Sequence, residues 1–129
     1  MTPTNAPIRV MIVDDHAVVR SGLCAFLNTY DDFNLVGEAE NGMEALKLAG
    51  QLNPDVIVMD LLMPEVDGLE ATLQLTREYM DTKIIAMTGA QGDRNFLDIA
   101  KLFGAHRTFE KPFDLKEMLN AVEAELAQK

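Results

Sequence analysis

The sequence of 129 residues is poor in cysteine, in basic residues and in long apolar runs. Its single cysteine, Cys24, excludes a disulfide within the chain, and its apolar neighbours favour a buried thiol over a nucleophile. No apolar run is long enough to span a bilayer, and the polar first residues lack the apolar stretch of a signal peptide. We therefore expect a cytoplasmic protein that does not insert into a membrane.

Basic residues are also scarce, with 11 Lys and Arg against 21 Asp and Glu, a net charge of −10. This balance argues against direct binding to nucleic acid, because clustered Lys and Arg make the contacts to a phosphate backbone. It suits cationic partners, or a carboxylate-rich site that holds a metal. The apolar fraction of 48% and the length are typical of one globular domain with a substantial core.

Short apolar segments alternate with segments of helical periodicity along the whole chain. The expected strands are residues 8–13, 33–39, 55–59, 83–87 and 106–110. The expected helices begin near Val18, Asn41, Asp67, Asp93 and Asp114. Such alternation builds a parallel sheet with helices on both faces and right-handed crossovers. We expect a doubly wound α/β domain over residues 8–127, preceded by a flexible tail over residues 1–7.

Polar residues follow four of the five expected strands, at the ends where open parallel sheets form their sites. They are Asp14 and Asp15, Asp60, Thr88, and Lys111. A buried carboxylate such as that of Asp60 is costly unless it is paired, hydrogen-bonded or metal-bound. Oxygen ligands without cysteine or a required histidine favour Mg²⁺ or Mn²⁺ over zinc. Each residue alone could be a local cap or turn residue, but the combination favours one shared site.

Four motifs occur in order: VDDH at 13–16, MDLLMPEVDG at 59–68, MTG at 87–89 and EKPF at 110–113. On these motifs the sequence resembles the receiver domains of response regulators in two-component signalling. The resemblance implies a flavodoxin-like (βα)5 fold with a five-stranded parallel sheet. It also implies a phosphorylation-activated switch that receives a phosphoryl group from a histidine kinase or a phosphotransfer protein, in a Mg²⁺-dependent reaction.

The resemblance assigns the acceptor and the metal ligands residue by residue. Asp60 would accept the phosphoryl group and, with Asp14 and Asp15, bind Mg²⁺ or Mn²⁺. The backbone carbonyl of Leu62 would be a further ligand. These roles agree with the needs of phosphoryl transfer, which depends mainly on positioning and on neutralising charge.

The resemblance also assigns the residues that would respond to the phosphoryl group. Thr88, Gly89 and Lys111 would bind it, and the peptide bond before Pro112 would be cis. The sequence departs from the commonest family pattern at Thr108, a switch position where many receivers carry Tyr or Phe. The expected readout is a changed protein-binding surface made by the fourth helix, fifth strand and fifth helix, which would contact a downstream protein.

His16 directly follows the acidic pair, and it could contact the metal or an incoming phosphohistidine. An exposed residue in the first helical turn is the simpler interpretation, because oxygen donors already suffice for the metal. Asp31 and Asp55 lie away from the carboxyl ends of the expected strands, so they are poor candidates for the site.

Three functions remain open at this level. The first is a stand-alone receiver that assists its own phosphoryl transfer and dephosphorylation without acting as an enzyme on other substrates, since little chain follows the last expected helix. The second is the receiver half of a DNA-binding transcription factor. The third is a Mg²⁺-dependent phosphohydrolase with an aspartyl-phosphate intermediate. Such enzymes usually place a second acid two residues after the nucleophile, where this chain has Leu62.

Overall fold

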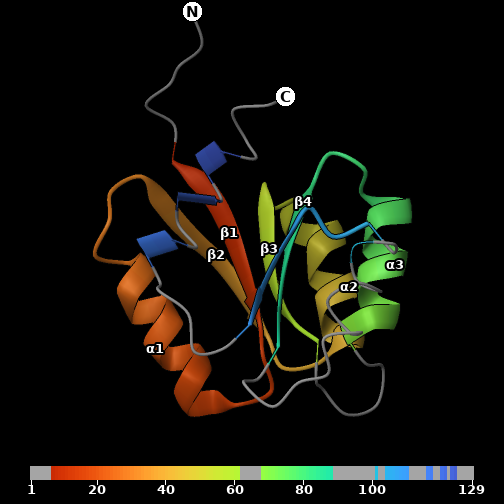
Figure 1. Ribbon diagram of the computed structural model, residues 1–129, viewed down its shortest axis with the longest axis horizontal. Coiled ribbons are helices and arrows are strands. Elements are labelled where there is room, and N and C mark those ends of the chain that lie inside the picture. The colour runs from red at the N-terminus through yellow and green to blue at the C-terminus, as the bar shows by residue number, and fades with distance from the viewer. Residues whose placement is uncertain are drawn as a thin grey trace, which may run out of the picture.

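The computed structural model describes residues 7–61, 68–88, 101, 104–110, 116–117, 120–121 and 123–124. Strands and helices alternate along this part of the chain (Figure 1). The elements are β1 Ile8–Val13, α1 Ala17–Leu27, β2 Phe33–Ala39, α2 Gly42–Leu52, β3 Val56–Asp60, α3 Gly68–Glu78, β4 Lys83–Thr88 and β5 Arg107–Glu110. Lys101 and the described residues between 116 and 124 are also helical. None of the helices in these segments is long and apolar enough to cross a bilayer.

The five strands form one parallel sheet in the order β2-β1-β3-β4-β5. The chain passes from β1 outward to β2 and returns on the other side of β1 as β3. Ligands of open α/β sheets bind at such a reversal, beyond the carboxyl ends of the strands. The register pairs Val13 of β1 with Met59 of β3, so the residues after these strands lie side by side. The predicted doubly wound, flavodoxin-like fold is confirmed.

The two faces of the sheet are covered by different helices. Figure 1 shows α1 on one face and α2 with α3 on the other. Alternate strand residues enter two separate cores. The core under α2 and α3 contains Met11, Val13, Ile57, Met59, Ile84 and Ala86. The core under α1 contains Val10, Ile12, Val56, Val58, Ile85 and Met87. Burial on both faces explains why the central strands are apolar without alternation.

β3 is the most enclosed of the described strands, because all five of its residues are buried. Burying one aliphatic side chain of this size stabilises the fold by about 1.5–3 kcal/mol. The strand begins at Val56, one residue later than predicted, and it includes Asp60 rather than ending before it. The ladder is extended because the amide of Leu61 donates to the carbonyl of Met87, at 2.8 Å.

Local signals in the sequence fix the ends of α2. The side chain of Asn41 accepts a hydrogen bond from the amide of Glu44, at 2.8 Å, as a capping residue does. The carboxylate of Glu44 reaches one residue further back than in a standard capping box, where it accepts from the amide of Glu40. Asn53 ends the helix in the left-handed conformation, with φ of 49°. This turn aims the chain back into the sheet as β3.

Gly104 lies before β5 with φ of 114°, a conformation that L side chains rarely adopt. A Cβ at this position would lie 2.6 Å from Cγ2 of Thr76 on α3. Glycine is the residue that takes this conformation without a steric penalty. The place of Gly104 directly against α3 sets the entry of the chain into the last strand. The predicted starts of the last two helices, Asp93 and Asp114, lie outside the described residues.

Candidate functional site

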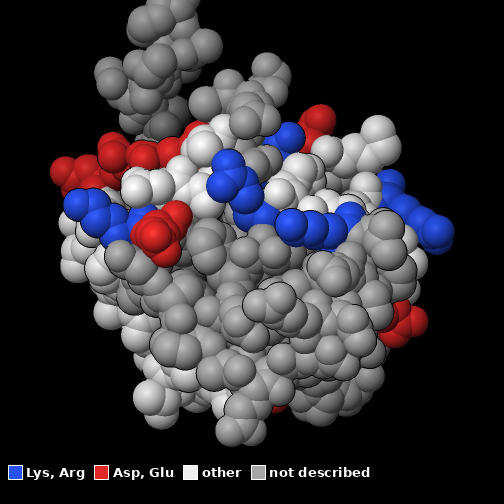
Figure 2. Space-filling view, in the orientation of Figure 1, with Lys and Arg blue, Asp and Glu red and all other residues white. Residues whose placement is uncertain are grey.

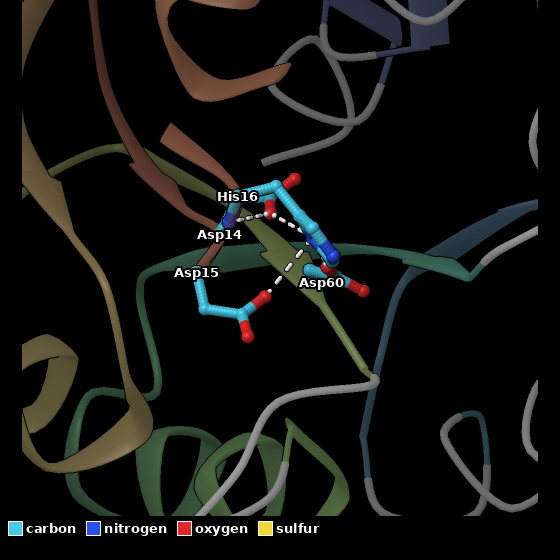
Figure 3. Close-up of side chains that lie close together, drawn as sticks. All are labelled: Asp14, Asp15, His16 and Asp60. Carbon is cyan, nitrogen blue, oxygen red and sulfur yellow. Dashed lines mark hydrogen bonds and ion pairs between the residues drawn. The ribbon is translucent and has the colours of Figure 1, made fainter. Parts of the chain in front are cut away.

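Asp60 ends β3 with its carboxylate at the carboxyl edge of the sheet (Figure 3). The residue is only 2% exposed. Its position is set by the sheet, since it is in register with Met87 of β4 while its neighbour Met59 is in register with Val13 of β1. The apolar strand before Asp60 therefore places its carboxylate in a buried position between β1 and β4.

Asp14 and Asp15 follow β1 at the same edge. Asp14 is fully buried, and its amide donates to the carbonyl of Ala39 at 3.0 Å, which holds it beside the end of β2. Its Oδ1 accepts a hydrogen bond from the amide of His16 at 2.8 Å, and this turn starts α1. Asp15 is partly exposed, but its Oδ1 is buried and has no well-directed hydrogen bond within the described part of the chain.

The predicted meeting of Asp14, Asp15 and Asp60 is confirmed by their geometry. One ligand atom from each, together with a nitrogen of His16, lies within 4.8 Å of every other (Figure 3). Two carboxylates about 4 Å apart repel by about 4 kcal/mol at an effective dielectric near 20. A buried Asp15 oxygen without a well-directed hydrogen bond, beside two buried carboxylates, fits a hard divalent cation such as Mg²⁺.

His16 is exposed, as predicted, but its ring turns back over the acidic residues. Its Nδ1 lies 3.1 Å from Oδ1 of Asp14, 3.0 Å from Oδ1 of Asp15 and 3.8 Å from Oδ2 of Asp60. The sequence favoured a residue without a part in the site, and the structure places its nitrogen inside the group of ligand atoms. The available signal was its position directly after two acids and directly before a helix.

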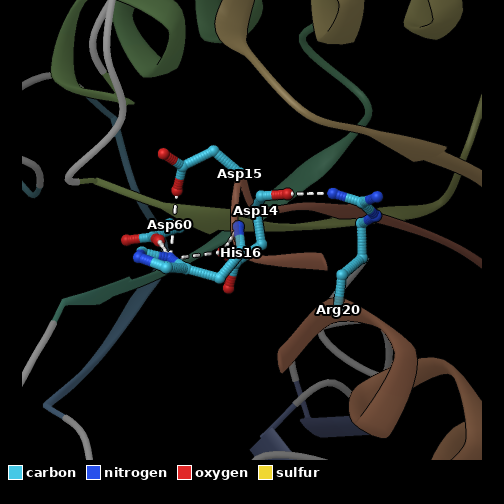
Figure 4. A network of polar contacts seen from close by, with 5 residues as sticks. All are labelled: Asp14, Asp15, His16, Arg20 and Asp60. Atoms are coloured by element: carbon cyan, nitrogen blue, oxygen red, sulfur yellow. Dashed lines mark hydrogen bonds and ion pairs between the residues drawn. The ribbon is translucent and has the colours of Figure 1, made fainter. Parts of the chain in front are cut away.

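Arg20, which sequence reasoning did not single out, supports Asp14 from behind. Its guanidinium donates to the backbone carbonyl of Asp14 (Figure 4). It also donates, at 3.1 Å, to Oε1 of Glu38 in β2. Asp14 is thereby held at its amide by Ala39 and at its carbonyl by Arg20. Arg20 lies six residues after Asp14 and 18 residues before Glu38. These contacts link α1 to the ends of β1 and β2, so no local motif could have indicated them together.

Cys24 lies on α1 beside this pair and is buried, as predicted. Burial raises the pKa of its thiol from 9.0 to about 11, and the charge of Glu38 and a hydrogen bond to it act in the same direction. The thiolate is the reactive form of cysteine. Cys24 is therefore a packing residue near the site rather than a nucleophile.

The remaining predicted site residues are described in part or not at all. Thr88 ends β4 and is in register with Glu110, so its backbone reaches the same edge of the sheet as Asp60. Thr108 of β5 is in register with Ala86 of β4. The side chains of Thr108 and Thr88 lie outside the described part of the chain. The predicted roles of Leu62, Gly89, Lys111 and the cis bond before Pro112 fall on residues outside the described segments.

The sequence matches the family model of the response regulator receiver domain over residues 10–123. LiaR, a transcriptional regulatory protein of Bacillus subtilis (strain 168), is 48% identical over 96 residues, covering 74% of this chain and 43% of LiaR. The response regulator GacA of Pseudomonas viridiflava is 42% identical over 115 residues, 89% of this chain and 53% of GacA. The chain thus spans about half the length of the curated relatives it matches.

Solved structures agree with this match. A LuxR-family two-component response regulator from Aurantimonas sp. SI85-9A1 has a TM-score of 0.87 and 32% identity, covering 96% of this chain and 88% of that chain. The signal receiver domain of the putative response regulator NarL from Mycobacterium tuberculosis has a TM-score of 0.87 and 28% identity, covering 95% and 98%. The family match includes the acidic residues that meet beyond β1 and β3, and the chain belongs to the family of response regulator receiver domains.

Proposed function

We propose that this chain is a phosphorylation-activated switch whose Asp60 accepts a phosphoryl group from a phosphohistidine of a histidine kinase or phosphotransfer protein. The single observation that carries the proposal is the buried carboxylate of Asp60 at the end of β3, with Asp14 and Asp15 beside it. Membership of the receiver family supports the donor class. The chain would assist its own phosphoryl transfer and dephosphorylation without turning over another substrate.

The chemical step is a displacement at phosphorus. One carboxylate oxygen of Asp60 attacks, the new O–P bond forms as the N–P bond of the phosphohistidine breaks, and the electron pair of that bond stays on the departing imidazole. Burial on a fixed strand end keeps the carboxylate in one orientation toward the incoming group. The rigid setting lets the protein contribute positioning rather than further covalent chemistry.

The residues present fit a resident divalent cation, Mg²⁺ or Mn²⁺. Asp14, Asp15 and Asp60 would hold it through carboxylate oxygens, and the backbone carbonyl of Leu62 is proposed as a further ligand. When bound, the cation would neutralise negative charge on the acids and on the phosphoryl oxygens. Without a cation, an anionic phosphoryl group would approach three carboxylates, which Coulomb repulsion opposes.

The response to phosphorylation is proposed to involve residues that follow β4 and β5. The Thr88 hydroxyl and the Lys111 ammonium would contact the phosphoryl oxygens, with Gly89 leaving room for the group. The register of Thr88 with Glu110, next to Lys111 in sequence, supports a shared response of these two strand ends. A changed surface around β5 and the last two helices would then alter binding of a downstream protein.

The test is phosphorylation by a small acyl phosphate with Mg²⁺, followed by intact mass spectrometry. Wild type should gain one phosphoryl group, and Asp60→Asn should gain none. Asp55→Asn is the matched control, because it makes the same change at the opposite end of β3 and should behave as wild type. A phosphoryl group gained equally by Asp60→Asn and wild type would remove Asp60 from the proposed role.

A second candidate function is the receiver half of a DNA-binding transcriptional regulator. It is favoured by the relatives, which include transcriptional regulatory proteins about twice the length of the matched region. In that case another domain would contact DNA, since this chain carries a net charge of −10. On the face shown in Figure 2, Lys and Arg side chains lie in a row across the described surface, with Asp and Glu side chains close by.

The two candidates differ in the size of the native protein. An antibody raised against this chain should detect a protein near 14.3 kDa in extracts of the source organism if the receiver stands alone. A protein of roughly twice that mass would support the transcriptional regulator, and a chain of this mass alone would contradict it.

A further inference from the structure

His16 brings a nitrogen into a group of ligand atoms that is otherwise made of carboxylate oxygens. Its main chain is fixed, because its amide donates to Oδ1 of Asp14 and its carbonyl accepts from the amide of Arg20 at the start of α1. Its ring extends over the site, as Figure 3 shows. The backbone of His16 is therefore fixed, and rotation of its side chain can bring the ring nitrogen to the cation position.

Two of the three distances from Nδ1 of His16 to the carboxylates match the spacing of neighbouring metal ligands. In an octahedral site with bonds of about 2.1 Å, neighbouring ligand atoms lie about 3.0 Å apart. Nδ1 of His16 lies 3.0 Å from Oδ1 of Asp15 and 3.1 Å from Oδ1 of Asp14. Its distance of 3.8 Å from Oδ2 of Asp60 falls between the spacings of neighbouring and opposite ligands.

We propose that His16 binds the resident cation directly through Nδ1 and so shifts the metal preference of this site from Mg²⁺ toward Mn²⁺. The inference rests on the cation site of the proposed function and adds a ligand to it. Mg²⁺ prefers oxygen and gives up water reluctantly, whereas first-row divalent metals, Mn²⁺ the weakest of them, also bind sites that contain nitrogen. A site with one imidazole and three carboxylates therefore gains more affinity for Mn²⁺ than for Mg²⁺.

If His16 does not bind the cation, its removal should have the opposite effect on metal affinity. If the ring only fills the space between the acids, a cation must displace it, and removing the ring would then strengthen the binding of both ions. The sign of the change in affinity on removal of His16 thus separates a ligand from a competitor.

The experiment compares the full chain with His16→Ala and with the control Val18→Ala. Val18 is 85% exposed in the first turn of α1, the helix that His16 caps, so its change should leave the site intact. Mn²⁺ affinity is measured from the free-ion signal in electron paramagnetic resonance, and Mg²⁺ affinity by competition with Mn²⁺. We expect His16→Ala to lose about tenfold more affinity for Mn²⁺ than for Mg²⁺, and Val18→Ala to match wild type.

Electron spin echo modulation supplies a direct readout that needs no variant to fold. Mn²⁺ bound to wild type should show coupling to one ¹⁴N nucleus, and His16→Ala should lose it. Absence of nitrogen coupling in wild type, or equal or tighter binding of both ions by His16→Ala, would overturn the inference. If wild type binds neither ion and gains no phosphoryl group, the proposed function fails instead, whereas Mg²⁺-dependent labelling of Asp60 without nitrogen coupling rejects the role of His16 alone.

Discussion

The two aspartates that flank β3, Asp55 and Asp60, show how one residue type serves two purposes. Asp55 precedes the strand, and its Oδ2 accepts a hydrogen bond from the amide of Arg9 at 3.0 Å. Its own amide donates to the carbonyl of Arg9, and its carbonyl accepts from Lys83. Asp60 ends the strand, almost fully buried and within reach of two other carboxylates.

The comparison separates structural from functional carboxylates by their surroundings. Asp55 meets a backbone donor of β1, so its negative charge stabilises the start of the sheet. Asp60 lies beside Asp14 and Asp15, so without a bound cation its charge opposes folding. A fold tolerates such a cost where the arrangement serves binding or chemistry, and the carboxyl end of a parallel sheet is the usual place.

The largest expected difference between the two ends of β3 is the response to Mg²⁺. At a Mg²⁺ concentration 100 times the dissociation constant, the free energy of unfolding should rise by about 2.7 kcal/mol in wild type and in Asp55→Asn. Asp14→Asn should show little of this rise, because it removes a ligand charge. Urea unfolding with and without Mg²⁺ measures the effect. If Asp14→Asn gains as much unfolding free energy from Mg²⁺ as wild type, Asp14 is not a ligand.

Without divalent ions, substitutions at the two ends should change stability in opposite directions. Asp60→Asn should raise the free energy of unfolding by about 1 kcal/mol, because it relieves repulsion among the acids. Asp55→Ala should lower it by about 1–2 kcal/mol through loss of the hydrogen bond to Arg9. Asp55→Asn keeps an acceptor oxygen and should lose less. Urea unfolding in a chelating buffer measures all three, and equal signs at both ends would contradict this explanation.

Two arginines that bind main-chain carbonyls extend the comparison. Arg20 donates to Asp14 near the site, and Arg9 donates to the carbonyl of Leu52 at the other end. Arg20→Lys and Arg9→Lys keep the charge and lose the planar fork, so each should cost roughly 0.5–1 kcal/mol of stability. Only Arg20→Lys should also weaken cation binding, by about threefold, in a Mn²⁺ titration. Equal affinities in both variants would show that Arg20 does not position Asp14.

The last effect is confined to alkaline pH, where the thiol of Cys24 ionises. Its pKa of about 11 in the folded chain lies above the ordinary 9.0. The unfolded thiol therefore ionises first, so the free energy of unfolding is unaffected below about pH 9 and falls as pH rises through 11. Wild type should lose more stability than Cys24→Ala over this range in urea unfolding. A stability difference between the two that stays constant from pH 8 to 11 would exclude the raised pKa.

The fold was predictable because each strand and helix is indicated by local patterns. The buried strands β1 and β3, where the strand order reverses, are continuous apolar runs. The alternation of strands and helices along the chain leaves few possible topologies. The meeting of Asp14, Asp15 and Asp60 followed from one general rule about strand ends. Strand boundaries were less certain, since the hydrogen bond from Leu61 to Met87 that extends β3 depends on a distant segment.

The supporting residues were not predictable in the same way. The pairing of Arg20 with Asp14 and Glu38 depends on the angle at which α1 leaves β1, which no local spacing encodes. The ring of His16 could equally have faced solvent, because a residue at a helix start has both directions open. In the structure, the contacts of its Nδ1 with the carboxylates of Asp14 and Asp15 hold the ring over the site.

The enclosure of β3 has a mechanical consequence. This strand is paired along both edges, and all five of its residues are buried. Its amide protons should exchange with solvent only when the whole domain unfolds, and more slowly than those of the other described strands. Asp60, the proposed acceptor, thus lies on a strand that opens only with the whole domain, so any rearrangement after its phosphorylation should occur at the periphery of the sheet.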